Sequence, residues 1–373
     1  MVDLLVTQAA DEPVMTTPRA GGPTMRALVK ARPEQGLEFD PTRPIPAAGR
    51  PGPREVLIRV RKAGVCGTDR HIWEWDEWAS ARIPVGIVTG HEFVGVIERI
   101  GDDVTSVQPG QRVCAEGHIA GGHDYNARTG NAHIARDVQI IGVDRDGCFA
   151  DYIMMPEANI WPVHEAIPDR IAAIMDPLGN AVHTVMAAGV SARSVLITGV
   201  GAIGLMAVTV ARAAGAARIF VTDIRPEHLD LARRLGADDA FDARAGDDWV
   251  GEVRRATRGE GPDVLLEMSG SPKAFDAGFD ALRRGGTAAL LGLPARPFPF
   301  DFNSRVIFKG ATVLGITGRR MFETWYQMEA LLLSGRLRLD EIITHQIPLA
   351  NYASAFALMQ SGEAIKIVLN VTD

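Results

Sequence analysis

One stretch near the middle of the chain constrains the fold more than any other. The apolar run "SVLITG" leads directly into "GVGAIG", in which Gly199, Gly201 and Gly204 have the G-x-G-x-x-G spacing. The first glycine permits a tight turn, the second lets a pyrophosphate approach the backbone, and the third lets a helix pack on the strand. A helix that begins here directs its positive end at the phosphates. The pattern therefore predicts a dinucleotide-binding site.

Continuous apolar runs follow this motif at regular intervals. Because they do not alternate with polar residues, they are expected to be strands buried on both faces. Helical patterns lie between the first four, over residues 201–214, 226–235 and 272–284. This alternation predicts an α/β doubly wound parallel sheet, which is a Rossmann domain, over residues 177–318. The runs are "SVLITG", "RIFVTD", "DVLLEMSG", "TAALLGL" and "TVLGITG".

The second strand of this domain indicates which dinucleotide would bind. "RIFVTD" ends in Asp223, 19 residues after Gly204. A carboxylate there can accept hydrogen bonds from both ribose hydroxyls and would repel a 2′-phosphate, so NAD is favoured over NADP. The nearby Arg225 leaves that preference open. The alternative, that the glycines serve only helix–strand packing, is weaker because strand, motif, helix and acid are all in register.

The first half of the chain has a β-rich pattern. "EVLIRVRKAG" places Val56, Ile58 and Val60 on one face, which is typical of a half-buried strand. Further short apolar runs are separated by Gly and Pro, a pattern that favours a small barrel or sandwich over residues 25–176. "MFETWYQMEALLLSG" predicts one amphipathic helix, and we expect residues 319–373 to return to this first domain. Residues 1–24 are predicted to be a disordered tail.

Composition excludes several classes of function. A chain of 373 residues suits two domains. A net charge of −7 argues against a nucleic-acid surface or a polybasic membrane patch, and no apolar run approaches the roughly 20 residues of a membrane helix. The chain has three cysteines, which are too few for a disulfide framework and favour a cytoplasmic protein. Two of them, Cys114 and Cys148, lie in apolar runs and are expected in the core.

The densest cluster of reactive groups lies in "AGVCGTDRHI" and "TGHEF". Cys66 follows a predicted strand, and His91 and Glu92 are adjacent to each other. Thiolate, imidazole and carboxylate are the ligand types that zinc accepts, and a catalytic zinc keeps one position open. Cys66 and His91 are 25 residues apart, so spacing alone leaves open a buried cysteine and a surface His–Glu pair.

Together, Cys66, the "GHE" of residues 90–92, the glycine motif and Asp223 resemble the zinc-dependent medium-chain dehydrogenase family. The resemblance spans nearly the whole chain from Met25. Within the family, "CGTDRHIWEWDEWA", "DPLGNAVHT", "EMSGSP" and "GRRMFETWYQM" are similar to the L-threonine 3-dehydrogenases. The resemblance implies a GroES-like catalytic domain beside the Rossmann domain, with NAD and one catalytic zinc as cofactors. It also implies a homotetramer that oxidises L-threonine to 2-amino-3-oxobutanoate. The substrate implied is a small amino alcohol.

The resemblance also assigns roles to individual residues. Cys66, His91 and Glu92 match the zinc ligands, and Asp176 matches an acid beside the metal. Thr68 and His71 match a pair that passes the substrate proton to solvent, and His118 matches a histidine at the edge of the substrate pocket. His228 stands where the family commonly has an arginine, which weakens one adenosine contact. The remaining matches line NAD: Ile203, Asp223, Leu291, Gly292, Leu293, Ile316 and Thr317.

One segment departs from the family pattern. Family members usually carry four cysteines around a structural zinc in the lobe that follows "EGH", and the corresponding residues here are Gly121, Asp124, Ala127 and Ala135. We therefore expect no structural zinc. The histidines at 118, 123 and 133 follow no common zinc spacing, so the loop over residues 117–135 is expected to be held by packing or subunit contacts.

Two alternatives to threonine oxidation remain open. One is a related zinc-dependent polyol, diol or sugar dehydrogenase, and the other is a non-catalytic relative that only binds a dinucleotide. A substrate ammonium would need acceptors, for which Asp76, Glu77 and Glu116 are candidates by sequence proximity alone. These three acids could equally be a solvated surface.

Overall fold

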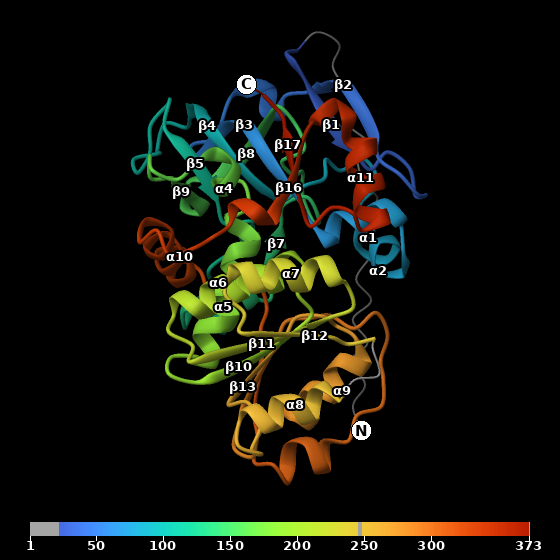
Figure 1. Ribbon diagram of the computed structural model, residues 1–373. Coiled ribbons are helices and arrows are strands. Elements are labelled where there is room, and N and C mark those ends of the chain that lie inside the picture. Colours follow the sequence, from blue (N-terminus) through green and yellow to red (C-terminus); the bar gives the residue numbers. More distant parts are fainter. Residues whose placement is uncertain (1–21, 245–247, 373) are drawn as a thin grey trace, which may run out of the picture.

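The computed structural model describes residues 22–244 and 248–372 of the chain. It has a β-rich domain, at the top of Figure 1, and a Rossmann domain below it. The predicted tail lies mostly outside the described residues, and β1 already begins at Thr24. None of the helices in the described part of the chain is long and apolar enough to cross a membrane.

The β-rich domain is built on a seven-stranded sheet with the order β16-β17-β3-β4-β5-β9, in which β8 also pairs with β3. The C-terminal strand pairs antiparallel with β3, with Ile367 opposite Val65. Residues from the end of the chain thus complete the sheet formed by the first half. The strands are β3 (Glu55–Val65), β4 (Glu92–Ile100), β5 (Arg112–Ala115), β8 (Tyr152–Pro156), β9 (Ile160–Pro162), β16 (Ile343–Pro348) and β17 (Lys366–Asn370).

Smaller elements cover this sheet. A separate hairpin joins β1 to β2, and the helix that follows β3 packs against a C-terminal helix through the stacked rings of Trp73 and Phe356, whose centroids are 4.6 Å apart. These elements are β1 (Thr24–Val29), β2 (Glu38–Pro44), α1 (Gly67–Glu74), α2 (Glu77–Arg82), α4 (Asp169–Ala172) and α11 (Tyr352–Ser361).

The Rossmann domain has a six-stranded, all-parallel sheet with the order β12-β11-β10-β13-β14-β15. This confirms the doubly wound sheet. The chain moves outward from β10 first in one direction and then in the other, so the strand order reverses at β10 and β13. The strands are β10 (Ser194–Thr198), β11 (Arg218–Asp223), β12 (Asp239–Asp242), β13 (Val264–Glu267), β14 (Thr287–Leu290) and β15 (Thr312–Gly315).

Helices cover both faces of the parallel sheet. The side chains of β10 and β11 alternate between two apolar clusters, one shared with α5, α6 and α7 and the other with α8 and α9. Figure 1 shows the sheet between these two layers. The helices are α5 (Met175–Ala188), α6 (Ala202–Ala213), α7 (Pro226–Leu235), α8 (Trp249–Ala256), α9 (Pro272–Ala281) and α10 (Glu323–Leu333), and α10 packs against α5.

The sequence-based expectation for this domain was wrong in four places, one of which is the helix α8, which it did not predict. It missed β12, whose sequence "DAFD" is polar because it is an edge strand that is only partly buried. It predicted that β15 is buried on both faces, yet most of β15 is exposed because it forms the other edge of the sheet. The helix expected over 272–284 ends at Ala281, since Leu282 is extended and carries the chain toward β14.

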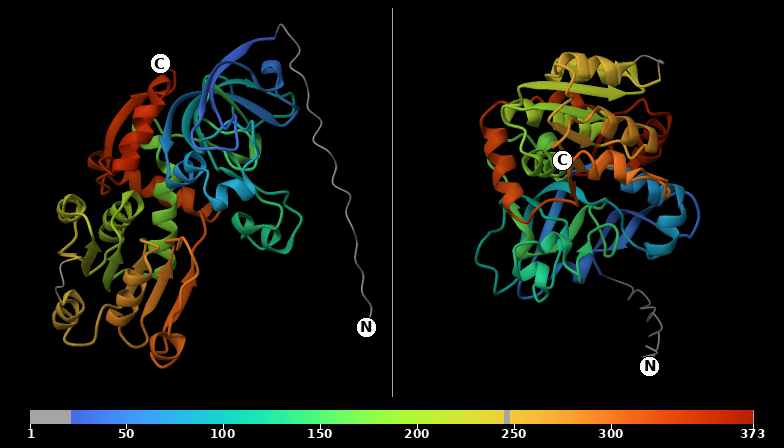
Figure 2. Two further views of the ribbon diagram at one scale, coloured as in Figure 1. Left: turned by 90° about the vertical axis from the view of Figure 1, so that its right-hand side faces the viewer. Right: turned by 90° about the horizontal axis from the view of Figure 1, so that it is seen from below.

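The lobe over residues 117–138 is more regular than the predicted loop. It contains β6 (His118–Ile119), which pairs with β7 (Gln139–Ile140), and the short helix α3 (Tyr125–Arg128). Asp124 caps α3 by accepting the Ala127 N–H at 2.8 Å, and its second oxygen accepts the Arg136 N–H at 2.6 Å. In the left view of Figure 2 this blue-green segment projects from the body of the molecule. A residue at a family cysteine position thus joins the two ends of the lobe.

Replacing Asp124 by Ala should loosen the lobe. Trypsin cleavage at Arg128 and Arg136 should become several-fold faster, because both hydrogen bonds are lost, whereas Asp248→Ala removes a comparable cap from α8 and should leave lobe cleavage unchanged. The N–H groups of Ala127 and Arg136 lower the pKa of Asp124. The protection should therefore persist near neutral pH and disappear only as pH falls through that lowered pKa. Equal cleavage of wild type and Asp124→Ala would contradict this.

Candidate functional site

Strand pairing brings the three predicted metal ligands together. Glu92 is the first residue of β4 and lies opposite Gly64 in β3, and Cys66 follows two residues later at the start of α1. His91 directly precedes β4. One thiol, one imidazole nitrogen and one carboxylate oxygen from these three side chains all lie within 4.8 Å of one another. The 25-residue separation in sequence is therefore closed by a single antiparallel pairing.

A glycine makes this geometry possible on the His91 side. Gly90 has a φ of +89°, in the left-handed region that favours glycine. A Cβ at this position would also overlap the ring of Phe149, which is buried. Any other residue at position 90 would be strained and would displace either the core or the backbone that carries His91.

The residues present fit a zinc ion. In a tetrahedral zinc site with bonds of about 2.0–2.3 Å, two ligand atoms lie roughly 3.3–3.8 Å apart. The three donor atoms here all lie within 4.8 Å of one another, so small side-chain adjustments would let them bind one ion. His91 is nine-tenths buried, and its Nδ1 atom has no hydrogen-bond partner among the described residues. A buried polar atom without a partner is costly unless something else satisfies it.

Glu92 is held by a buried cation from the end of the chain. The Lys366 ammonium on β17 lies 2.8 Å from Oε1 of Glu92 and 2.6 Å from Oε2, and it also donates to the carbonyl of Val65 at 2.8 Å. Both side chains are buried. Burial opposes the charge on Lys366, but the Glu92 carboxylate outweighs it and raises the pKa of Lys366. The carboxylate is thus fixed in place by a buried ammonium group.

A second acid, Asp69, contacts the backbone of Cys66. Asp69 is fully buried and accepts the backbone N–H of Cys66 at 2.8 Å, which closes the first turn of α1. Its other oxygen lies 3.8 Å from Nδ1 of His91. Burial is the main reason that the pKa of Asp69 is raised to about 6. Asp69 therefore orients Cys66 through a hydrogen bond and places a carboxyl group near His91.

The predicted proton pathway lies along α1. The Thr68 hydroxyl is 4.0 Å from the Cys66 thiol, so it lies beside the cluster. His71 is three residues further along the helix, and residues with this spacing share a helix face. The His71 side chain is 53% exposed and therefore reaches solvent. Thr68 therefore lies beside the cluster and His71 at the surface, on the same face of α1.

Arg319 organises the residues predicted at the substrate side. This fully buried side chain pairs with Glu116 at 2.6 Å and with Asp176 at 2.8 Å. Glu116 also accepts hydrogen bonds from Trp325 at 2.7 Å and lies 2.8 Å from Nδ1 of His118. Asp176 and His118, which are 58 positions apart in the sequence, are therefore held by one ion-pair network.

This network bears on the three acids that were candidates to accept a hydrogen bond from the substrate ammonium, namely Asp76, Glu77 and Glu116. Burial disfavours the charge of Glu116, but Arg319 outweighs it, so the pKa of Glu116 is well below its ordinary value. Its oxygens are occupied by Arg319, Trp325 and His118, and it is neither a solvated surface residue nor an available substrate contact. Asp76 instead binds His71 at 2.6 Å, and Glu77 is exposed in the first turn of α2.

The predicted cofactor residues all lie at the carboxyl ends of the parallel strands. Gly199 follows β10 with a φ of +82°, and a Cβ at Gly204 would overlap the carbonyl of Gly199. Open parallel sheets bind ligands at this edge, where the strand order reverses. Gly201, Ile203 and Gly204 begin α6, Asp223 ends β11, His228 lies in α7, Leu291–Leu293 follow β14, and Ile316 and Thr317 follow β15.

Asp223 is oriented by its own surroundings. It accepts the Val200 N–H at 2.7 Å and the Arg225 N–H at 3.0 Å, and it lies 3.8 Å from Nδ1 of His228. Burial would raise the pKa of Asp223, but these hydrogen bonds outweigh it and lower the pKa. The Arg225 guanidinium donates to the carbonyl of Gly362 at the end of α11. Arg225 therefore points at α11, and Asp223 stays negatively charged.

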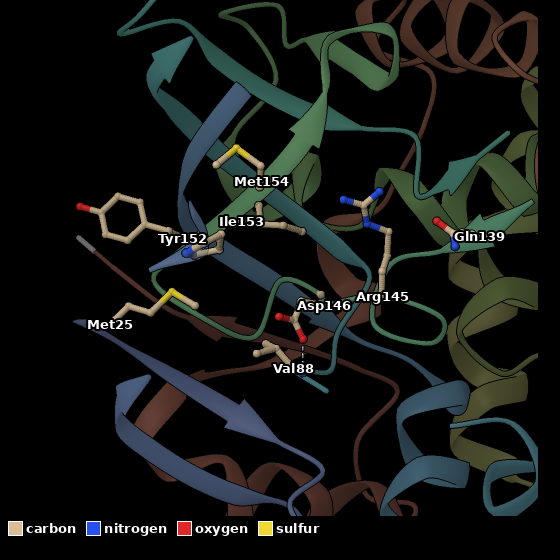
Figure 3. Close-up of a pocket in the computed structure, with 10 residues that line it drawn as sticks. Met25, Val88, Gln139, Arg145, Asp146, Tyr152, Ile153 and Met154 are labelled. Carbon is tan, nitrogen blue, oxygen red and sulfur yellow. Dashed lines mark hydrogen bonds between the residues drawn. The ribbon is translucent and has the colours of Figure 1, made fainter. Parts of the chain in front are cut away.

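A separate hollow lies in the β-rich domain (Figure 3). Its volume is about 270 Å³, and it contains the side chains of Met25, Tyr152, Arg145 and Asp146. None of the predicted site residues lines it. Asp146 is already occupied by the Val88 N–H at 2.8 Å. The candidate site is therefore the cluster of potential metal ligands at Cys66, His91 and Glu92, and not this hollow.

Sequence reasoning missed several residues that support the site. Lys366 and Arg319 were overlooked. Lys366 is a lone cation within an apolar run, which favours a buried partner of opposite charge, but Arg319 is followed directly by Arg320 and gave no such signal. Asp69 was overlooked because its spacing from Cys66 matches a helix cap, a common local feature. Ser269 after β13, against which Gly199 packs, had no signal of its own beyond the turn sequence "SGSP".

Comparison with known proteins agrees with this arrangement. Residues 202–334 match the zinc-binding dehydrogenase family, and residues 52–165 match the alcohol dehydrogenase GroES-like domain. The L-threonine 3-dehydrogenase of Chelativorans sp. is 47% identical over 346 residues, which cover 93% of this chain and 98% of that protein. The L-threonine 3-dehydrogenase of Deinococcus radiodurans is 44% identical over the same length and the same shares of the two chains.

Solved structures of related enzymes have the same fold. The alcohol dehydrogenase from Thermus sp. ATN1 superimposes with a TM-score of 0.83 at 30% identity, covering 93% of this chain and all of the other. A zinc-binding dehydrogenase from Sinorhizobium meliloti bound to NADP gives 0.85 at 25% identity, covering 94% and 100%. The fold and site thus define a two-domain, dinucleotide-dependent alcohol dehydrogenase.

The chain belongs to the zinc-binding dehydrogenase family, with a GroES-like domain and a Rossmann domain. It is an enzyme of that family, and its cofactors are zinc and a nicotinamide dinucleotide.

Removing the Arg319 cation should destabilise the protein severely. Arg319→Met leaves the buried Glu116 without its partner, which should lower the free energy of unfolding by about 3–5 kcal/mol. The exposed pair of Arg170 with Asp340 provides a control, since Arg170→Met should cost no more than about 1 kcal/mol. Urea unfolding followed by tryptophan fluorescence measures both. Similar losses for the two variants would contradict this role of Arg319.

Proposed function

We propose that this enzyme oxidises L-threonine to 2-amino-3-oxobutanoate with NAD, at one zinc ion held by Cys66, His91 and Glu92. The observation that carries the proposal is the clustering of these three ligand atoms within 4.8 Å. The threonine specificity is supported by relatives that are 43–47% identical over about 93% of this chain. Sequence identity at this level over this span favours a shared substrate over a related polyol, diol or sugar.

Different residues of the chain would have different roles in the reaction. Zinc, when bound, supplies a Lewis acid that makes the substrate hydroxyl more acidic, and NAD accepts the hydride. Thr68 would receive the hydroxyl proton and pass it to His71, whose exposed ring returns it to solvent. Lys366 holds Glu92 in place. Asp176 would stand beside the metal, where its Oδ1 atom already pairs with Arg319.

Asp223 is the basis for preferring NAD to NADP. Its carboxylate is negatively charged and would repel a 2′-phosphate. The nearest cation, Arg225, is turned toward the carbonyl of Gly362, so it is not directed at a phosphate. We infer that the 2′-phosphate of NADP would be poorly accommodated.

Substrate-dependent formation of NADH tests the activity. L-threonine should give turnover that chelation abolishes and added zinc restores, while 2,3-butanediol, sorbitol and glucose should be much poorer. NADP should support at most a few per cent of the rate with NAD. Cys66→Ala should reduce kcat/KM by at least a thousandfold, whereas Cys114→Ala removes a thiol outside the cluster and should retain activity if folded. Elemental analysis should give one zinc per chain.

Other outcomes would revise the proposal. A preference for a diol or a sugar would support the second enzyme class, and dinucleotide binding without any turnover would support a non-catalytic relative. Two zinc ions per chain would show that the lobe holds a metal after all.

We also propose a cytoplasmic homotetramer. The described part of the chain has three free cysteines, and two of them are buried thiols, as suits a reducing compartment. In the described structure β15 hydrogen-bonds to β14 on one side only, and Val313, Ile307 and Phe308 near it are exposed. An exposed apolar edge strand is a pairing site that a second copy would cover.

Sedimentation should give the mass of four chains. Val313→Lys should shift this mass toward smaller species, because it places charge on the pairing edge, whereas Leu333→Lys at the exposed end of α10 should not. A monomeric wild-type protein would contradict the assembly.

A further inference from the structure

We propose that Asp76 is a positioning residue for His71 and fixes which ring nitrogen of that histidine takes up the substrate proton. The proposal rests on the function proposed above, in which His71 passes this proton to solvent. Its basis is the contact between Oδ2 of Asp76 and Nδ1 of His71, which are 2.6 Å apart.

The backbone between the two residues is bent so that they meet. Helix α1 ends at Glu74, and Trp75 follows as its C-cap, with a φ of +55° and an N–H that donates to the carbonyl of His71 at 3.0 Å. This left-handed turn reverses the chain and brings Asp76 against the ring five residues earlier. The Trp75 ring lies 4.5 Å from the Lys30 ammonium and packs on the apolar core. The turn is therefore supported by packing as well as by hydrogen bonds.

Asp76 is itself fixed, so it can fix its neighbour. Its Oδ1 atom caps α2 by accepting the Ala79 N–H at 2.9 Å, while Oδ2 faces His71. Burial would raise the pKa of Asp76, but the hydrogen bonds from Ala79 and His71 outweigh it and lower the pKa. The carboxylate is therefore ionised and cannot rotate without losing the cap.

This arrangement selects one tautomer of His71. A carboxylate accepts hydrogen bonds only, so Nδ1 must carry a proton, and Nε2 is left as the free acceptor. When Nε2 takes a proton, the ring becomes a cation beside the negative charge of Asp76, which stabilises it. The proton then leaves to solvent from the same exposed ring, and no other bond changes.

The other groups around His71 do not replace this role. Trp78 approaches the ring edge-on with centroids 6.1 Å apart and offers no carboxylate. On α1 itself, Arg70 is paired with Glu74 at 2.7 Å, and Glu77 of α2 is exposed. Within the described part of the chain, the His71 ring contacts the Asp76 carboxylate and the edge of the Trp78 ring.

A residue that only capped α2 would have the same local geometry, so the test must separate the two roles. Asp76→Asn keeps a good N-cap but removes the charge and offers an amide that can hydrogen-bond to either tautomer. Asp248 caps α8 in the same way, accepting the Gly251 N–H at 2.8 Å, and lies in the Rossmann domain. Asp248→Asn is therefore the matched control.

We expect Asp76→Asn to lower kcat/KM for L-threonine at least tenfold. Asp248→Asn should leave this value unchanged, and both variants should unfold at the wild-type temperature. In a His71→Asn background, Asp76→Asn should cause no further loss, because its effect acts through that ring. An equal loss in both backgrounds, or no loss in either, would overturn the proposal.

A spectroscopic readout separates this proposal from the function on which it rests. Long-range ¹H–¹⁵N spectra of ¹⁵N-histidine-labelled enzyme, with His71 assigned by the His71→Asn variant, report the tautomer directly. Wild type should show His71 protonated at Nδ1 at neutral to alkaline pH, and Asp76→Asn a mixture. A mixed tautomer in wild type would overturn the role of Asp76 even if threonine is oxidised. Failure of threonine oxidation with a fixed tautomer would instead overturn only the proposed function.

Discussion

Two buried ion pairs hold the candidate site together. Glu92 with Lys366 and Glu116 with Arg319 join residues 274 and 203 positions apart, and these four side chains are almost completely removed from solvent. A buried charge is tolerated only with a partner, so each pair forces a distant segment of the chain to return. The return of β17 fixes Glu92, and the return of the segment before α10 fixes Asp176 and His118. The site therefore cannot form before the C-terminal part of the chain has folded.

This dependence explains why the fold was easier to predict than the support of the site. The parallel sheet follows from local patterns, because continuous apolar runs and the glycine motif act within a few residues. Both errors in the strands of that domain occur at the edges of its sheet. The polar strand β12 and the exposed strand β15 lack the double coverage that gives the central strands their continuous apolar sequence.

The candidate ligands could be chosen from the sequence by residue type and resemblance, but not by spacing. Cys66 and His91 become neighbours only through the register of β3 with β4. The hydrogen-bond and ion-pair partners of the reactive groups were harder still to predict from the sequence. Asp76 was considered as one of three acids near the substrate, and only coordinates show that its two oxygens serve His71 and the cap of α2. A side chain with several possible partners gives no sequence signal for the one it takes.

The central claim is that one zinc ion binds to Cys66, His91 and Glu92. X-ray absorption at the zinc edge of the purified enzyme tests it most directly, since it reports the identity and distance of the atoms bonded to the metal. The account predicts a single zinc environment with one sulfur at about 2.3 Å and the remaining nitrogen or oxygen ligands at about 2.0–2.2 Å. A zinc shell without sulfur, or a fully active enzyme without zinc, would contradict it.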